Sequence, residues 1–216
     1  MKLQSYKIMM LILIGVLFLS ISSVCAETAE EAVNKGMEYG KQGKYDEAIT
    51  EFNKAIASNP NYYNAYYNRA LAYTYKREND LAILDYSKTI EINPKADNAY
   101  TNRGNLYSEQ GNYDRAISNY NKAIELNPNP ELPNAYSNRG AAHGVKGNYN
   151  QAIWDCNQAI EIDPNYAPAY NNRAMAYFHK QEYDKSWKDV HKAAELGYKI
   201  DQEFINDLKR VSGREN

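Results

Sequence analysis

The feature that most constrains this chain is an Asn-Pro or Asp-Pro pair that returns at nearly constant spacing. Its prolines recur at intervals of 34, 34 and 36 residues, each just after an apolar stretch of helical pattern: Pro60, Pro94, Pro128 and Pro164. Proline ends helices because it lacks a backbone N–H and its ring clashes with the preceding turn. A fixed period of about 20 to 50 residues is typical of chains that stack one small unit repeatedly. The spacing therefore predicts a repeat array.

Each period contains two stretches with helical spacing. The third unit has small or aromatic residues at i, i+4 and i+7 in both stretches, at Tyr100, Gly104 and Tyr107 and then at Ala116, Tyr120 and Ala123. Such spacing places these residues on one face of an α-helix. Gly111 separates the stretches, so each unit is predicted to be a helical hairpin. We expect the second helix of each hairpin to be capped by Asp46, Asp80, Asp114, Asn150 or Asp184.

The third unit resembles the tetratricopeptide repeat (TPR) family, because it has that family's residues at the family's spacing: Gly104, Tyr107, Ala116, Tyr120, Ala123 and Pro128. The resemblance implies an all-α, right-handed superhelical solenoid. Residues 27–200 would form about five TPR units, near 29–62, 63–96, 97–130, 133–166 and 167–200. The fifth unit departs from the pattern, since Ser186 replaces the small Ala and no closing proline follows.

Two segments lie outside the regular pattern. Residues 201–216 contain a short apolar stripe, Phe204, Ile205 and Leu208, which predicts a helix that covers the last exposed face of the array. The proline-rich junction at 128–133 is two residues longer than the other junctions. It is interpreted either as a tolerated loop insertion or as a stiffened elbow that changes the pitch of the superhelix.

The N-terminus has the pattern of a secretory signal peptide. Lys2 and Lys7 precede an almost unbroken apolar run at 8–21, and small residues surround a predicted cut after Ala26. The run is shorter than the about 20 apolar residues that span a membrane. Residues 1–26 are therefore predicted to be a signal peptide, with an uncleaved membrane anchor as the alternative and a lipoprotein signal at Cys25 as a weaker one. The mature chain would be exported, to a periplasmic or extracellular location.

Charge makes some partners improbable for the mature chain. Removal of residues 1–26 takes away two lysines and no acid, so the formal net charge moves from −2 to −4. Binding of nucleic acid needs a concentrated basic surface, so no nucleic-acid partner is expected. A membrane would be a partner only if the N-terminal segment stays uncleaved. The protein is expected to act as a monomer.

No motif of an enzyme is present in the sequence. The sequence has no phosphate-binding glycine loop, no paired-carboxylate motif and no metal-binding residues at a characteristic spacing. No cofactor, metal or small-molecule substrate is therefore expected. His143 and Cys156 replace aromatic residues that face each other in other units. They would form a nucleophile pair or part of a metal site if they were close and accessible. Packing in a buried seam is the favoured interpretation.

The candidate binding residues are asparagines that recur at one position of the first helix. They lie roughly opposite its packed side and are expected to face solvent along the inner wall of the solenoid: Asn34, Asn68, Asn102, Asn138 and Asn172. A carboxamide both donates and accepts, so a row of them suits the backbone of an extended peptide. The resemblance favours this role, because TPR domains that hold extended peptides have asparagines at the matching position. Alternatively, asparagine recurs here through repeat copying or for solubility.

Other inner-wall positions refine this hypothesis. Val33, Met37, Asn98 and Asn105 stand where family members that clamp a C-terminal carboxylate have lysine or arginine, so that kind of ligand is not expected. Small apolar pockets or simple packing are alternative interpretations of Tyr67, Leu71, Tyr75, Met175 and Phe178. The arginines that follow each asparagine are expected to join neighbouring units: Arg69, Arg103, Arg139 and Arg173.

Together these features predict a non-enzymatic scaffold or adaptor that holds an extended or helical peptide segment in its concave groove. The alternative is a self-associating structural module or a membrane-tethered assembly factor. The residues predicted to contact the peptide are Asn34, Asn68, Asn102, Asn138, Asn172, Tyr67, Leu71, Asn98 and Asn105.

Overall fold

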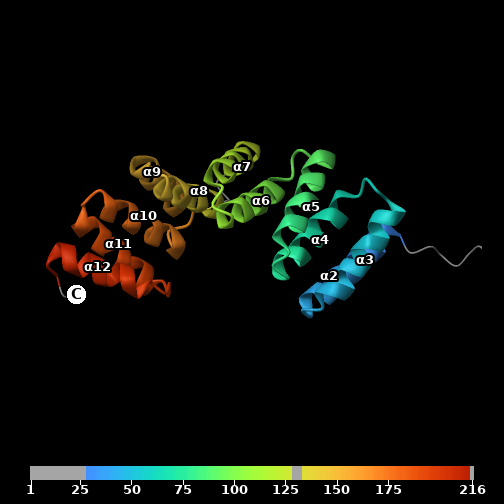
Figure 1. Cartoon of the computed structure of the whole chain (residues 1–216), viewed down its shortest axis with the longest axis horizontal. Coiled ribbons are helices and arrows are strands. Elements are labelled where there is room, and N and C mark those ends of the chain that lie inside the picture. Colours follow the sequence, from blue (N-terminus) through green and yellow to red (C-terminus); the bar gives the residue numbers. More distant parts are fainter. Residues whose placement is uncertain (1–27, 128–132, 215–216) are drawn as a thin grey trace, which may run out of the picture.

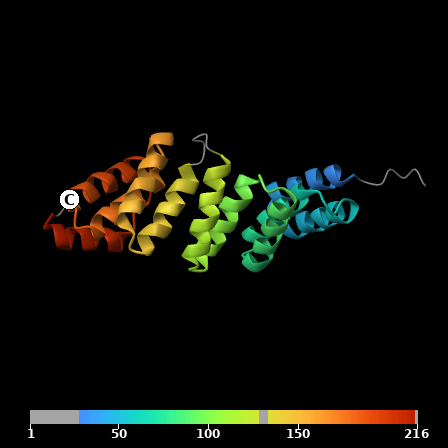
Figure 2. The same ribbon diagram turned by 90° about the horizontal axis from the view of Figure 1, so that it is seen from above.

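The computed structural model describes residues 28–127 and 133–214, and these form helical hairpins that stack in chain order. The pairs are α2 (Ala29–Lys41) with α3 (Tyr45–Ser58), α4 (Tyr63–Tyr75) with α5 (Asn79–Ile92), α6 (Asp97–Glu109) with α7 (Tyr113–Leu126), α8 (Pro133–Val145) with α9 (Tyr149–Ile162), and α10 (Ala167–His179) with α11 (Tyr183–Glu195). Helix α12 (Gln202–Ser212) follows the last pair. Figures 1 and 2 show an elongated solenoid with α2 and α3 near one end and α12 at the other. The predicted all-α solenoid is confirmed.

Small residues let the two helices of a hairpin approach closely. A Cβ atom added to Gly104 of α6 would lie 2.7 Å from the Tyr120 ring of α7, which is closer than van der Waals contact allows. On the second helices, one alanine per unit is almost completely buried in the first four units: Ala48, Ala82, Ala116 and Ala152. The repeated small residues that identified the units are therefore the residues that the hairpin crossing requires.

The core consists of buried clusters between the layers of helices. One position of the second helix contributes to it in every unit, with Phe52, Tyr86 and Tyr120 in the first three units and the smaller Cys156 and Val190 in the last two. All five side chains are buried. Each hairpin packs on its neighbours, so burial of apolar side chains is repeated along the array and is the main stabilising contribution.

The second helices begin two residues earlier than the predicted caps require. They start at the tyrosine or asparagine before the expected capping residue, so Asp46, Asp80, Asp114, Asn150 and Asp184 lie inside the first turn. Carboxylates are still favourable there, because they face the positive end of the helix dipole. They also reach the next unit: Asp46 pairs with Lys76 at 2.6 Å, and Asp114 pairs with Lys146. The cap prediction is therefore wrong, and the acidic side chains join units instead.

Helix α12 closes the C-terminal end of the array. Its Leu208 is fully buried against Ala174, Trp187 and Val190, and the Phe204 ring lies 5.5 Å from that of Phe178. Asp201 caps the helix, since its side chain accepts a hydrogen bond from the Glu203 amide at 2.8 Å. The predicted capping helix is present.

Two predictions fall outside the part of the chain that the structure describes. They are the signal peptide at 1–26 and the elbow at the junction, of which residues 128–132 are not described. Within residues 28–127 and 133–214, every helix is too short or too polar to cross a membrane.

Candidate functional site

The first helices of the hairpins form one layer of the solenoid, which we call the inner face. Helix α2 packs against α4, α6 against α8, and α8 against α10. A hydrogen bond of 3.2 Å between Asn102 and the Tyr67 hydroxyl links α6 to α4. The inner face therefore runs along all five units and carries every residue predicted to bind a peptide.

The asparagine row lies on this face, but most of it is less exposed than expected. Asn34 is exposed, whereas Asn68, Asn102, Asn138 and Asn172 are half-buried. The reason is that three of the amide groups donate to the preceding first helix: Asn102 to Tyr67, Asn138 to Asn105 at 2.9 Å, and Asn172 to Ser137 at 3.0 Å. Asn68 donates within its own helix, to the Asn64 carbonyl at 2.8 Å.

These contacts leave one half of each carboxamide unused. Among the described residues, no hydrogen bond is made to the side-chain oxygen of Asn68, Asn102, Asn138 or Asn172. The donated N–H groups fix the orientation of the amides, and a carboxamide oxygen can accept a further hydrogen bond. The row is therefore a set of oriented acceptors, one in each of the last four units.

Asn105 and Leu71 occupy the same position in neighbouring units but have different surroundings. Asn105 accepts hydrogen bonds from Asn138 and from the buried Tyr120 hydroxyl, the latter at 2.9 Å. In the second unit, Leu71 replaces this asparagine, and the hydroxyl of the equivalent Tyr86 is buried without a hydrogen-bond partner. Burial raises the pKa of Tyr86. Asn98, the other predicted polar contact, is exposed on α6.

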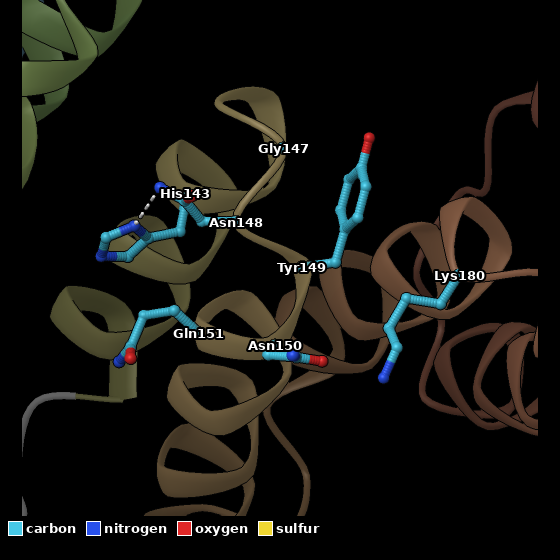
Figure 3. Close-up of a pocket in the computed structure, with 7 residues that line it drawn as sticks. All are labelled: His143, Gly147, Asn148, Tyr149, Asn150, Gln151 and Lys180. Carbon is cyan, nitrogen blue, oxygen red and sulfur yellow. Dashed lines mark hydrogen bonds between the residues drawn. The ribbon is translucent and has the colours of Figure 1, made fainter.

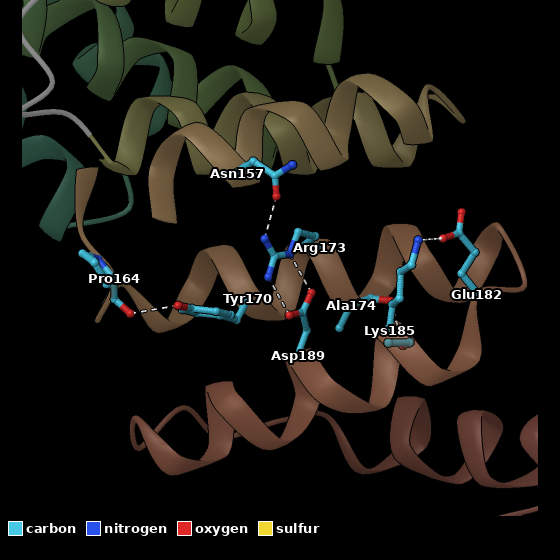
Figure 4. Close-up of polar contacts among 9 residues, drawn as sticks. Asn157, Pro164, Tyr170, Arg173, Ala174, Glu182, Lys185 and Asp189 are labelled. Atoms are coloured by element: carbon cyan, nitrogen blue, oxygen red, sulfur yellow. Dashed lines mark hydrogen bonds and ion pairs between the residues drawn. The ribbon is translucent and has the colours of Figure 1, made fainter. Parts of the chain in front are cut away.

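The arginines of the repeated phrase join the layers of the solenoid. Figure 4 shows Arg173 between Asp189, which accepts from it at 2.7 Å, and Asn157 of the preceding unit, which accepts at 2.6 Å. The other units repeat this pattern, with Arg69 on Asp85 and Asn53, Arg103 on Asn119 and Ser87, and Arg139 on Asp155 and Asn121. The guanidinium groups are thereby used in packing, as the sequence suggested.

Few charges remain on the inner face. Helices α4, α8 and α10 each contain only one charged residue of the types Lys, Arg, Asp and Glu. In each helix this residue is the arginine that joins the two layers. Helix α6 adds Asp97 and Glu109. The inner face of the last four units is therefore almost neutral, and the charged residues lie mainly on the second helices.

A cavity of about 410 Å³ opens between α2, α3 and α4, and we call it the N-terminal cavity. The Tyr45 and Tyr75 rings are stacked on one side of it, 5.2 Å apart and 5° from parallel. Lys41 is its one charged lining residue. The full lining is Met37, Gly40, Lys41, Tyr45, Ala48, Phe52, Asn68, Leu71, Ala72 and Tyr75.

The residues predicted to form apolar pockets are thus divided among different surroundings. Leu71 and Tyr75 line the N-terminal cavity. Tyr67 does not line it; its ring packs on Tyr86, and Phe178 packs on Phe204 beneath α12. Met175 is 43% exposed on α10. Sequence reasoning missed Tyr45, which belongs to a second helix and meets Tyr75 through the stacking of units.

A second cavity, of about 620 Å³, lies at the turn between α8 and α9 and is polar and open (Figure 3). Figure 3 shows His143 beside Asn148 and, across the cavity, Lys180 near Asn150. Asn150 stands where other units have the aspartate that pairs with the next unit, and Lys180 instead pairs with Glu182 at 2.9 Å. A similar cavity of about 390 Å³ lies at the preceding turn, where Asp114 does pair with Lys146, so such a hollow is a repeated feature of these turns.

The pair considered for catalysis is not arranged for it. His143 is half-buried and its Nδ1 atom lies 3.5 Å from the Asn148 amide, while Cys156 is fully buried beside Ala159 and Ala169. Burial raises the pKa of the Cys156 thiol to about 12, so it is protonated at neutral pH and is a poor nucleophile. Within the described residues, no group of three metal-binding side chains is found.

Comparison with known proteins gives a consistent result. Models described as tetratricopeptide repeats match residues 63–96, 98–130 and 133–166, and two further TPR models match 36–77 and 156–188. Protein MJ0572 of Methanocaldococcus jannaschii is 48% identical over 44 residues, which are 20% of this chain and 51% of that protein. The matched stretch thus spans about half of that relative.

Solved structures share the fold over most of the chain. PilW, a type IV pilus biogenesis factor, has a TM-score of 0.76 and 18% identity, with 87% of each chain covered. YrrB, a TPR protein with an unusual peptide-binding site, has a TM-score of 0.68 and 20% identity, with 83% of this chain and 91% of YrrB covered.

Proposed function

Since the chain belongs to the tetratricopeptide repeat family, we propose that its inner face binds an extended, largely uncharged segment of another protein. The observation that carries this proposal is the row of oriented asparagine oxygens along an almost neutral face. Every residue of a peptide except proline offers a backbone N–H. The asparagine oxygens can accept from such groups without selecting the side chains next to them.

The neutral inner face also defines what the segment lacks. A C-terminal carboxylate or a strongly acidic peptide would need basic partners, and three of the four arginines nearest to the row are already paired with Asp85, Asp155 and Asp189. A basic peptide would find few carboxylates on these helices. A segment with Ser, Thr, Asn, Gly or apolar side chains fits this face best.

We also propose that the protein is an exported, monomeric adaptor without catalytic activity. Export rests on the signal-peptide pattern of residues 1–26, and the intact mass of the secreted chain tests it. A monomer is favoured by polar terminal surfaces, because α2 exposes Glu31, Glu38 and Gln42. Helix α12 likewise exposes Glu203, Asn206 and Arg210. Such surfaces oppose end-to-end stacking.

Peptide display tests the binding site directly. Protein expressed from the whole 216-residue chain is used to select from a random library of 12-residue peptides, and affinities are measured for the selected peptides. The variant carries Asn102→Ala, Asn138→Ala and Asn172→Ala. Because each hydrogen bond contributes about 0.5–1.5 kcal/mol, we expect binding at least about tenfold weaker.

The control variant carries Ser118→Ala, Gln151→Ala and Lys188→Ala, three exposed positions on second helices, and it should bind like the wild type. Circular dichroism establishes that both variants are folded. Equal affinity of the wild type and the folded asparagine variant would show that the row is not the binding site.

A further inference from the structure

The N-terminal cavity differs in chemistry from the rest of the inner face. Its apolar walls are formed by Met37, Phe52, Leu71 and Tyr75. The third unit is polar at two of the equivalent positions, with Asn105 in place of Leu71 and Glu109 in place of Tyr75. Two of these apolar side chains are strongly exposed, Tyr75 at 68% and Met37 at 41%. Exposed apolar groups gathered around a concave site are typical of a binding pocket.

We propose that this cavity anchors one large apolar side chain of the bound segment, next to an acidic residue that pairs with Lys41. The proposal rests on the proposed peptide binding and adds a specificity element to it. The segment would then run along the neutral asparagine row from a fixed starting point. The occupant is thus a partner peptide that contains a large apolar residue beside Asp or Glu.

The identity of residue 71 supports a binding role over a folding role. An asparagine at the equivalent position of the third unit accepts a hydrogen bond from the buried Tyr120 hydroxyl at 2.9 Å. Leucine at 71 leaves the buried Tyr86 hydroxyl without a partner. Unpaired buried polar groups are destabilising, so Leu71 weakens the fold at this point. Leu71 is only partly buried where it packs on the core, and it also lines the cavity, so an apolar wall for a ligand accounts for leucine at this position.

The cavity is also shaped in advance of binding. The Tyr75 ring is exposed but is held in place by its stack on Tyr45. A volume of about 410 Å³ lies at the low end of the about 300–1,000 Å³ range of ligand pockets, which suits one large side chain. A fixed wall reduces the entropy lost when that side chain enters.

Charge determines the neighbour of the anchor residue. Lys41 is the one charged residue that lines the cavity. Its contact with Glu38 is long, at 3.7 Å, and both side chains are more than half exposed. Such a pair is weak and exchanges readily with a ligand carboxylate. An acidic residue beside the anchor is therefore favoured, and a basic one is disfavoured.

Three synthetic peptides test the proposal. Each has 12 residues of Gly, Ser and Asn with blocked ends, and the central pair is Trp-Asp, Ala-Asp or Trp-Lys. Fluorescence anisotropy gives their affinities for protein expressed from the whole chain. We expect the Trp-Asp peptide to bind at least about tenfold more tightly than Ala-Asp, because one large apolar side chain is buried. It should also bind a few times more tightly than Trp-Lys.

The decisive variant is Leu71→Asn, which makes the cavity polar and offers Tyr86 the partner that Tyr120 has. It should remain folded and lose the preference for Trp over Ala. Met175→Asn, at the equivalent exposed position of the fifth unit, is the matched control and should keep the preference. If Leu71→Asn does not fold, Tyr75→Ser replaces it, because that side chain is 68% exposed.

Each contrary outcome has a distinct meaning. A preference for Trp that survives in folded Leu71→Asn overturns the anchor pocket. Equal binding of all three peptides, weakened by the asparagine-row variant, overturns the anchor and leaves the groove proposal standing. If no peptide binds, both proposals fail. A wild type that is dimeric in light scattering, with a monomeric Leu71→Asn variant, would assign the cavity to a second copy of the chain and overturn the proposal.

Discussion

The turn inside each hairpin depends on a single backbone conformation. Its left-handed residue is glycine in three units, with φ of 74° at Gly43, 74° at Gly111 and 80° at Gly147. In the second and fifth units the same place is taken by Arg77 and Gln181, both at φ 61°. Side chains with a Cβ atom are strained in this conformation, by roughly 1–2 kcal/mol.

Replacement of the two strained residues should therefore stabilise the protein. We expect Arg77→Gly and Gln181→Gly each to raise the free energy of unfolding by about 0.5–1 kcal/mol, which is the relieved strain less the added chain entropy. Gly111→Ala is the control and should lower it by about 1 kcal/mol. Urea denaturation followed by circular dichroism measures all three. An unchanged midpoint for both glycine variants would show that these turns carry no strain.

For single residues, some predictions from the sequence were correct and others were wrong. The repeated register identifies Arg77 and Gln181 as turn residues, since they align with Gly43, Gly111 and Gly147. The starts of the second helices were placed two residues too late, because the residue directly after the left-handed turn position is the N-cap. The exposure of the asparagines was overestimated, because their hydrogen bonds to the preceding unit depend on the stacking geometry and not on local pattern.

Among the helices, α12 has the clearest separate role. Its inner side carries Phe204, Ile205 and the fully buried Leu208, whereas Val211 is 42% exposed. The surface that it covers includes Trp187 and Val190, which would otherwise be open to water. A terminal unit with an uncovered apolar face promotes self-association.

Disruption of α12 should thus affect both stability and solubility. We expect the double variant Phe204→Ser with Leu208→Ser to lower the free energy of unfolding by at least about 3 kcal/mol, because the buried Leu208 and the half-buried Phe204 side chains are lost. Light scattering should also show mass that rises with concentration. Val211→Ser, on the outer side of the same helix, should leave both properties unchanged. A monomeric, equally stable double variant would contradict the capping role.

The elements themselves could be predicted almost completely from the sequence. The period of apolar and small residues located the helical pairs, because hairpin crossing demands Gly or Ala at positions such as Gly104 and Ala116. The N-terminal cavity could not be predicted, since the stack of Tyr45 on Tyr75 joins residues of two different units. Only the relative placement of units brings them together.

At the scale of the whole molecule, charge in the last four units is concentrated in the layer of second helices. The first helices α4, α8 and α10 are almost neutral, while the second helix α11 alone carries Asp184, Lys185, Lys188, Asp189, Lys192 and Glu195. Salt weakens binding that depends on exposed charges, because the Debye length falls to about 3 Å at 1 M. Binding on a neutral face should be largely independent of salt.

The peptides selected by display provide the measurement. We expect their affinities to change by less than about fivefold between low and high salt, as one exposed pair at Lys41 contributes about 0.2–1 kcal/mol. The same titration on a protein that clamps a carboxylate with several basic residues serves as the contrast. A loss of two orders of magnitude in high salt would show that charged surfaces, and not the inner face, hold the peptide.

The arginines that join neighbouring units have a consequence for how the chain folds. Arg69, Arg139 and Arg173 each reach back to an asparagine 16 to 18 residues earlier, on the unit that precedes their own. In each of these contacts the asparagine is synthesised before the arginine, so it leaves the ribosome first. Units can therefore assemble vectorially from the N-terminus, each new hairpin docking on a finished surface. Helix α12 follows the fifth hairpin along the chain, so it docks on a surface that the preceding units have already formed.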